Sequence, residues 1–236
     1  GIVLSPISNT DSYLFHKNHT KGAYLRKLQD TQFHQIYWET PYYNKVLDHF
    51  LSGHDFTNKV ILDFGCGDGR FTQYLLKKGA AKIVCVDFDY GTLVSLSQFA
   101  EENNLNEKLL IIHSDFDNLF FESNQFDLIL AIGVLYYLNE RYESAVRYFG
   151  TLMKPGGNLI TSDPDLEGSF LRMLMYESLN EAIQTFKSRR FKETKDDTVY
   201  RFRIFDEPEM LAIFKNASLE VVDRHRISLF HNLIRV

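Results

Sequence analysis

Three glycines alternate with other residues directly after a short apolar run, at Gly65, Gly67 and Gly69. The apolar run, residues 60–64, is typical of a buried strand, and an amphipathic stretch follows the glycines. A strand that passes through glycines into a helix exposes its backbone at the carboxyl end of a sheet, where open α/β sheets bind their ligands. The pattern therefore predicts a ligand-binding turn.

The other residues of this turn restrict the ligand. A pyrophosphate-binding turn requires a third small residue where this chain has Arg70. The Gly-Lys-Ser/Thr sequence of a P-loop does not follow either. Asp63 and Asp68 bring negative charge to the turn, which would repel a diphosphate and would suit a cationic ligand. A dinucleotide is therefore a poor fit.

The segment 60–71 resembles motif I of the class I S-adenosylmethionine (SAM) methyltransferases, Leu-Asp-x-Gly-Cys-Gly-x-Gly. Further segments follow in the order and spacing of that family, at residues 82–87, 114–117, 126–135 and 152–160. They look like a second strand that ends in an acid, the end of a third strand, a fourth strand with its loop, and the turn into a fifth strand. Together the segments cover about residues 58–163, and their conjunction is highly specific.

The resemblance implies which residues hold SAM. Asp63 would orient the ammonium group, unless it only caps nearby backbone amides, and Asp87 would accept hydrogen bonds from the ribose hydroxyls. The expected cofactor-binding set is Asp63, Gly65, Cys66, Gly67, Gly69, Asp87, Phe88, Asp115, Phe116 and Ile132.

The adenine side of that set leaves alternatives open. Asp115 would accept from the adenine amino group, and the competing choice is Asp117. Phe116 would offer a backbone N–H to the ring. Phe88 would pack beside the adenine. Ile132, at the end of the fourth strand, would lie beneath the ligand. For both residues the alternative is an ordinary role in the core.

The resemblance also implies transfer of the sulfonium methyl group to an N, O or C nucleophile by in-line displacement, leaving S-adenosylhomocysteine. The protein then has to align and desolvate the reactants, and needs a base only for a protonated acceptor. None of the eight histidines lies in the matching loops; His113 is interpreted as an edge histidine, so no catalytic residue is predicted. His16 and His19 lack Cys or acidic partners, and no metal site is predicted.

In this family the acceptor is covered by N-terminal helices and by an insertion after the fifth strand, and here both are rich in aromatic residues and methionine. The candidate pocket residues are Tyr37, Trp38, Tyr136, Tyr137, Met173 and Tyr176. An apolar pocket suits a small organic acceptor. The alternative is that these side chains only bury their segments on the core. The basic run from Arg189 to Lys195 is expected to be a solvated mobile loop, or else a clamp for an acidic substrate.

The elements that must position these residues alternate along the chain. Strands are predicted at 60–64, 82–87, 109–113, 126–132 and 157–162. Helices are predicted at about 69–78, 91–104 and 139–153. A helical stretch at about 166–190, a strand at 198–204, a helix at 207–216 and a strand at 219–227 are expected to follow. This alternation predicts a doubly wound, mostly parallel seven-stranded α/β sheet with an antiparallel last strand and helices on both faces.

We expect an N-terminal arm and helical cap at 1–52 and a SAM-binding domain at 53–236, with a helical insertion at about 166–197, forming a single compact domain overall. The chain has 236 residues, 44% of them hydrophobic, enough for one such domain.

Composition narrows the class of function. A net charge of −5 argues against broad nucleic-acid binding, and no apolar run is long enough to span a membrane. Two cysteines, Cys66 and Cys85, give no disulfide framework, and with no signal peptide visible we expect a cytoplasmic protein. The leading hypothesis is a methyltransferase for a small molecule. Alternatives are a methyltransferase acting on protein or RNA, a non-catalytic SAM-binding module and, more distantly, an NAD-dependent oxidoreductase.

Overall fold

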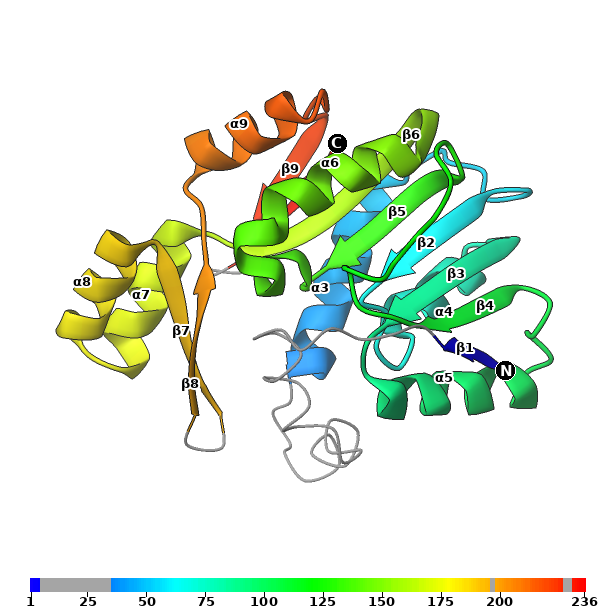
Figure 1. The fold of residues 1–236 in the computed structure, drawn as a ribbon, viewed down its shortest axis with the longest axis horizontal. Helices are drawn as coiled ribbons and strands as arrows, with labels where there is room; N and C mark the ends of the chain where they lie inside the picture. Colours follow the sequence, from blue (N-terminus) through cyan, green and yellow to red (C-terminus); the bar gives the residue numbers. More distant parts are fainter. Residues whose placement is uncertain (5–34, 196–197, 227–230) are drawn as a thin grey trace. The chain divides into compact units, whose positions relative to one another are not determined.

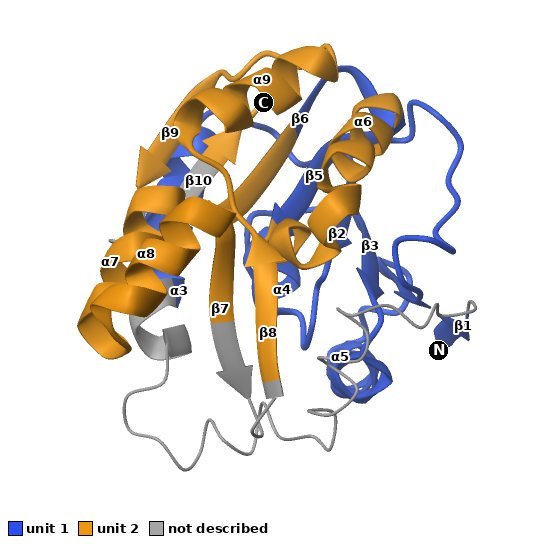
Figure 2. Ribbon diagram, turned by 60° about the vertical axis from the view of Figure 1, so that its left-hand side comes forward, with its two compact units in different colours: residues 1–131, 152–158 blue, residues 132–151, 159–236 orange. Residues whose placement is uncertain are grey.

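The fold is an α/β sheet with flanking helices, seen in a computed structural model that describes residues 1–4, 35–195, 198–226 and 231–236 (Figure 1). Eight strands hydrogen-bond in the order β1-β4-β3-β2-β5-β6-β10-β9, and β7 and β8 form a separate pair. The predicted class, a mostly parallel α/β sheet, is confirmed. The chain divides into two compact units, residues 1–131 with 152–158 and residues 132–151 with 159–236 (Figure 2). The predicted domain boundary at residue 52 stays a prediction.

The first unit contains the parallel part of the sheet. Its strands are β1 (Ile2–Leu4), β2 (Val60–Phe64), β3 (Lys82–Asp87), β4 (Leu109–His113) and β5 (Phe126–Ile132, of which the last residue belongs to the second unit). Its helices are α3 (Gln35–Phe50), α4 (Arg70–Lys77) and α5 (Tyr90–Glu102). Because the strands are parallel, the carboxyl ends of β2, β3 and β4 lie at one edge of the sheet. In the register Asp63 pairs with Cys85 and Asp87 with His113.

The core of this unit forms where apolar strands meet apolar helix faces. Ile61 and Leu62 of β2 are fully buried, as expected for a central parallel strand that is covered on both faces. Leu47 and Phe50 from α3 and Leu75 from α4 are buried in the same unit. This packing holds the end of β2, and with it the glycine turn, in a fixed place.

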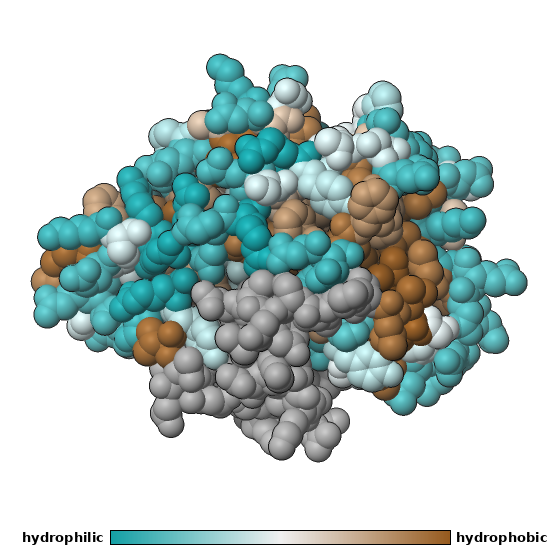
Figure 3. Space-filling model, viewed as in Figure 1, coloured by the Kyte–Doolittle hydropathy of each residue, from teal (hydrophilic) through white to brown (hydrophobic). Residues whose placement is uncertain are grey.

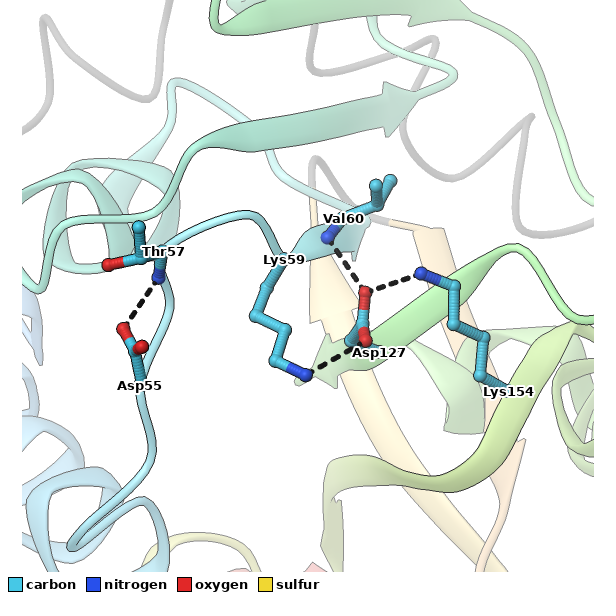
Figure 4. A network of polar contacts seen from close by, with 6 residues as sticks. All are labelled: Asp55, Thr57, Lys59, Val60, Asp127 and Lys154. Carbon is cyan, nitrogen blue, oxygen red and sulfur yellow. Dashed lines mark hydrogen bonds and ion pairs between the residues drawn. The ribbon is translucent and has the colours of Figure 1, made fainter.

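At the opposite edge of the sheet, one carboxylate connects the first residues of β2 and β5. Asp127, the second residue of β5, accepts a hydrogen bond from the backbone N–H of Val60 at 3.0 Å (Figure 4). It also pairs with Lys59 at 3.2 Å and with Lys154 at 2.8 Å. These cations lower the pKa of Asp127 against the opposing effect of its burial. The cluster therefore fixes the start of β2 against the start of β5.

The described connection from β4 to β5, residues 114–125, contains no helix. Val3 of β1 is 50% exposed and Leu110 of β4 is 47% exposed. Apolar side chains accordingly gather over β3 and β4 on the face drawn in Figure 3.

The second unit is built around antiparallel strands, β6 (Met153–Pro164, whose first half belongs to the first unit), β10 (His231–Arg235) and β9 (Asp223–Arg226). Its other elements are the 3-10 helix η1 (Leu135–Arg141), α6 (Tyr142–Leu152), α7 (Leu166–Tyr176), α8 (Leu179–Ser188), β7 (Arg190–Lys195), β8 (Thr198–Arg203) and α9 (Glu207–Asn216). The range predicted for α9 is confirmed. The Asp206 side chain caps α9 by accepting a hydrogen bond from the backbone N–H of Glu209. The Glu209 side chain in turn accepts a hydrogen bond from the backbone N–H of Asp206.

Several predicted elements were wrong in detail. Residues 2–4, expected in a loose arm, form β1 at the edge of the sheet, which gives eight strands instead of seven. The strand near 200 pairs with β7 in a hairpin outside the main sheet, so the basic run expected as a mobile loop is itself a strand. The strand expected at 219–227 is shorter than predicted and is β9. The last strand in the sequence, β10, lies between β9 and β6 in the sheet.

The helical predictions also needed correction at two places. The stretch at 166–190 divides at residues 177–178, where the Ser178 hydroxyl accepts from the backbone N–H of Glu181 and starts α8. The helix expected from 139 begins only at Tyr142, because Asn139 has φ 51° and ψ −116° and interrupts the helical path. Among the described residues, no helix is long and apolar enough to cross a membrane.

Candidate functional site

The glycine turn follows β2 and is held by β3. The backbone N–H groups of Gly65 and Cys66 both donate to the Val86 carbonyl, at 2.8 and 3.1 Å. Gly67 has φ 54°, and a Cβ at this residue would meet no atom within 4 Å. A ligand could therefore approach the backbone of Gly67 closely from the side where a side chain would otherwise stand.

Gly69, which is also predicted to bind the cofactor, differs from Gly67 in its surroundings. It is the N-cap of α4 at φ 89°, and a Cβ there would lie 2.5 Å from Cδ1 of Leu96 in α5. Its N–H donates to the Cys66 carbonyl. The absence of a side chain at Gly69 thus allows α4 and α5 to pack closely.

Asp87, the predicted ribose ligand, ends β3 with a buried carboxylate. Its Oδ2 accepts from the Gly67 N–H at 2.8 Å, and its Oδ1 accepts from the Asp89 N–H at 2.8 Å. Burial raises the pKa of Asp87 to about 7, against the lowering effect of these two backbone bonds. One carboxylate thus connects the glycine turn to the turn between β3 and α5.

Asp63 lies deeper, at the end of β2. Its Oδ2 accepts from the Thr72 hydroxyl of α4 at 2.6 Å. Burial raises its pKa to about 6, and the Thr72 hydrogen bond and the charge of Arg70 oppose that rise. Neither Thr72 nor Arg70 was assigned a role from sequence, because nothing in the motif pairs them with Asp63.

In the segment after β4, the Asp115 side chain accepts hydrogen bonds from a residue three positions further along the chain. Its Oδ1 accepts from the backbone N–H of Asn118 at 3.0 Å and from the Asn118 side chain at 2.8 Å. Asp117, the competing choice for the adenine, is exposed. The Phe116 ring meets Phe64 edge to face, with 6.4 Å between centroids. These contacts fix residues 115–118 beside the end of β2.

The charge of the site is negative. Burial is the main cause of the raised pKa of Asp87, and the negative charge of Asp63 is a smaller cause. Burial also raises the pKa of Asp68. The guanidinium of Arg70 lies 4.4 Å from the centroid of the Phe71 ring and offsets part of this charge. Such a site favours a ligand that carries positive charge.

The thiols near the turn are free. Cys66 and Cys85 are both buried and form no disulfide. Burial raises the pKa of Cys66 well above its ordinary value, so its thiol stays protonated. The described residues contain no group of three or more His, Cys, Asp or Glu that could hold a metal ion, and His16 and His19 lie outside them.

Most predicted cofactor residues lie in the first compact unit; Ile132, the buried last residue of β5, is assigned to the second. The candidate pocket residues differ in how far they are exposed to solvent. Met173 is 3% exposed, a core residue of its unit, while Tyr176 is 69% exposed. The side chains of Tyr37 and Trp38 lie outside the described residues.

Tyr136 and Tyr137 are the candidates that the structure gathers into one cluster. Their ring centroids are 4.2 Å apart, and Tyr137 meets the buried Phe202 of β8 edge to face at 4.7 Å. Asn139 adds a polar connection between η1 and the hairpin, because its Oδ1 accepts from the Arg203 N–H at 2.9 Å. Phe202 and Asn139 were not predicted, since their partners lie far away in sequence.

Comparison with known proteins matches residues 61–157 to a family described as "Methyltransferase domain". The ribosomal protein L11 methyltransferase of Shewanella pealeana is 31% identical over 113 residues, which is 48% of this chain and 36% of that protein. The chain thus spans about a third of the length of this curated relative.

Solved structures resemble almost the whole chain. The 1,6-didemethyltoxoflavin-N1-methyltransferase of Burkholderia thailandensis, crystallised with its acceptor and S-adenosylhomocysteine, covers 98% of this chain and 90% of its own, with a TM-score of 0.66 and 18% identity. The magnesium protoporphyrin IX methyltransferase of Synechocystis PCC 6803 covers 96% and 98%, with a TM-score of 0.67 and 14% identity. At such identities the likeness concerns the fold.

Proposed function

We propose, from the class I methyltransferase domain that residues 61–157 form, that this chain binds SAM and transfers its methyl group to a small organic acceptor. The observation that carries the proposal is the buried Asp87 carboxylate bonded to the Gly67 amide. A buried carboxylate at the end of a parallel strand, beside a glycine turn, suits the ribose hydroxyls of such a cofactor.

The residues of the site fit this cofactor. SAM supplies an activated methyl group on a sulfonium, and its sulfonium and ammonium charges suit a site that contains the carboxylates of Asp63 and Asp68. We assign Asp87 to the ribose hydroxyls, the open backbone at Gly67 to the methionine part, and Asp115 with Phe116 to the adenine. Phe88, Gly65 and Cys66 complete the proposed wall of the site within the first unit, and the assignment of Ile132 stays a prediction.

The chain's contribution to the reaction is orientation and exclusion of water. Fixed groups that hold both reactants in line supply several kcal/mol by proximity. We name no catalytic base; one is needed only if the acceptor atom carries a proton at the working pH. We propose the Tyr136–Tyr137 pair, with the exposed Tyr176, as candidates for contact with the acceptor.

The small-molecule acceptor is supported by the extent of the likenesses. The two structural neighbours named above act, by their titles, on a small heterocycle and on a porphyrin, and each matches nearly the whole chain. The ribosomal protein methyltransferase matches only about half of it. A protein or RNA acceptor is therefore the second candidate.

Calorimetric titration with SAM, S-adenosylhomocysteine and NAD tests the cofactor. We expect SAM and S-adenosylhomocysteine to bind and NAD to give no heat; NAD binding without SAM binding contradicts the proposal. Asp87→Asn keeps the size of the side chain and removes its charge, so it should weaken SAM binding. If this variant binds SAM as tightly as the parent, the ribose assignment is wrong.

A methyl-labelled SAM assay tests the acceptor. The protein is incubated with a metabolite extract and, separately, with protein and RNA fractions. Label in small molecules supports the proposal, and label only in the protein or RNA fraction supports the second candidate. SAM binding with no transfer to any fraction indicates a non-catalytic binding module.

A further inference from the structure

His113, interpreted from sequence as an ordinary edge histidine, joins the two turns of the proposed nucleoside site. It is the last residue of β4 and pairs in the ladder with Asp87, the last residue of β3. Beyond this pair the backbone N–H of Ser114 donates to the Asp87 carbonyl at 3.0 Å. The carbonyl of the next residue, Phe88, accepts a hydrogen bond from Nε2 of His113 at 2.9 Å.

This bond holds the turn between β3 and α5. The Asp87 carboxylate of that turn accepts from the Asp89 N–H, and Asp89 caps α5 by accepting from the Gly91 N–H at 2.8 Å. The first residue of the helix, Tyr90, places its ring edge to face on His113, with 5.4 Å between centroids. His113 therefore contacts this turn through both its ring nitrogen and its ring face.

We propose that His113 is a positioning residue for the nucleoside half of the SAM site. Its Nε2–H holds the Phe88 carbonyl, and this fixes the direction in which Asp87 and Phe88 face the ribose and adenine. A carbonyl accepts only, so the hydrogen is on Nε2. The inference rests on the proposed function, and it adds a residue of β4 that acts through the neighbouring turn.

Two substitutions separate the hydrogen bond from the ring. His113→Phe keeps an aromatic ring for Tyr90 and removes the donor. His113→Gln keeps an N–H donor and removes the ring. His54→Phe is the matched control, because His54 also hydrogen-bonds a backbone carbonyl, that of Ser52 at 3.4 Å, and stacks on Phe56, but it precedes β2.

The experiment measures calorimetric affinities for SAM and for 5′-methylthioadenosine, which lacks the amino-acid part. For His113→Phe we expect both affinities to fall by the same factor, roughly 3- to 10-fold, the effect of one lost hydrogen bond. His113→Gln should bind within about twofold of the parent on the same argument, and His54→Phe should match the parent.

Hydrogen exchange without ligand provides a second readout. In His113→Phe the amides of Asp89 and Tyr90 should exchange faster, whereas strand β2 should not change. The inference is overturned if His113→Phe binds both probes like the parent, or if His113→Gln loses as much affinity as His113→Phe. A parent protein that binds no SAM overturns the proposed function instead, and the exchange result then shows separately whether His113 holds the turn.

Discussion

The Asp87 carboxylate accepts a hydrogen bond from the Gly67 amide at 2.8 Å, across the gap between the ends of β3 and β2. The carboxylate is buried, and burial raises its pKa to about 7, so it gains or loses a proton near neutral pH. Ribose hydroxyls donate to its ionised form. Ligand binding should therefore lower this pKa and release a proton.

The first prediction follows from this linkage. SAM affinity should rise as the pH increases from about 5.5 to 7.5, by up to about tenfold per pH unit, and level off above the free-state pKa. Calorimetry at pH 6.5 in buffers of different ionisation enthalpy counts the protons released. Asp87→Asn should remove most of the pH dependence; a variant that keeps the full slope shows that another group titrates.

The second prediction concerns Gly157 of β6, which lies beside the backbone at the start of β5. A Cβ there would lie 2.9 Å from the Lys154 carbonyl oxygen and 3.2 Å from that of Phe126. Because these atoms belong to the backbone and cannot move aside cheaply, Gly157→Ala should lower the free energy of unfolding by about 1–3 kcal/mol.

The control for this substitution is Gly150→Ala. Gly150 lies within α6, and the nearest atom to its Cβ would be 3.6 Å away. Alanine favours a helix, so this variant should match or exceed the parent in stability. Urea denaturation compares the two; equal losses in both variants would refute the close-contact argument.

The third prediction concerns the Asp127 cluster. Asp127→Asn keeps an acceptor for the Val60 N–H and loses the charge that pairs with Lys59 and Lys154, whereas Asp127→Ala loses both. We expect the alanine variant to lose about 1–3 kcal/mol of unfolding free energy, and the asparagine variant less. Both are measured by urea denaturation at pH 7.

The pH dependence of the same cluster has a definite sign. The pKa of Asp127 is lowered in the folded protein, so its stabilisation is present above its unfolded pKa of about 3.9 and is lost as the pH falls below it. The difference between parent and Asp127→Ala should therefore shrink on acidification toward pH 3. A constant difference would show that charge is not the cause.

The fourth prediction concerns Asp163 in the second unit. Its Oδ2 accepts from the Tyr142 hydroxyl at 2.9 Å and from the Thr161 hydroxyl at 2.7 Å. Burial raises its pKa to about 6. The folded state thus holds a proton that the unfolded state releases near pH 4, and this contribution to stability is present below pH 4 and lost as the pH rises to about 6.

Asp163→Asn should remove this contribution while keeping the size of the side chain. Between pH 4.5 and 7.5 the stability of the variant should fall less steeply than that of the parent. Asp63 and Asp87, whose pKa values are also raised, account for the remaining slope. Parallel pH profiles in parent and variant would exclude Asp163 as a contributor.

Sequence alone determined the features that depend on local pattern. The apolar strand 60–64, the glycines that follow it and the acid at residue 87 predicted the parallel sheet and the edge at which we propose that the cofactor binds, because periodicity and turn chemistry act over a few residues. The cap of α9 is equally local, since Asp206 and Glu209 are three residues apart.

Only the tertiary structure decided the long-range pairings. His113 reaches the carbonyl of a residue 25 positions away, and Asp127 reaches Lys59 across 68 positions. The pairing of β1 with β4, and the place of β10 between β6 and β9, join strands whose own sequences do not specify their neighbours. Such contacts form because the sheet brings the strand ends together, and no pattern along the chain records which residues will meet.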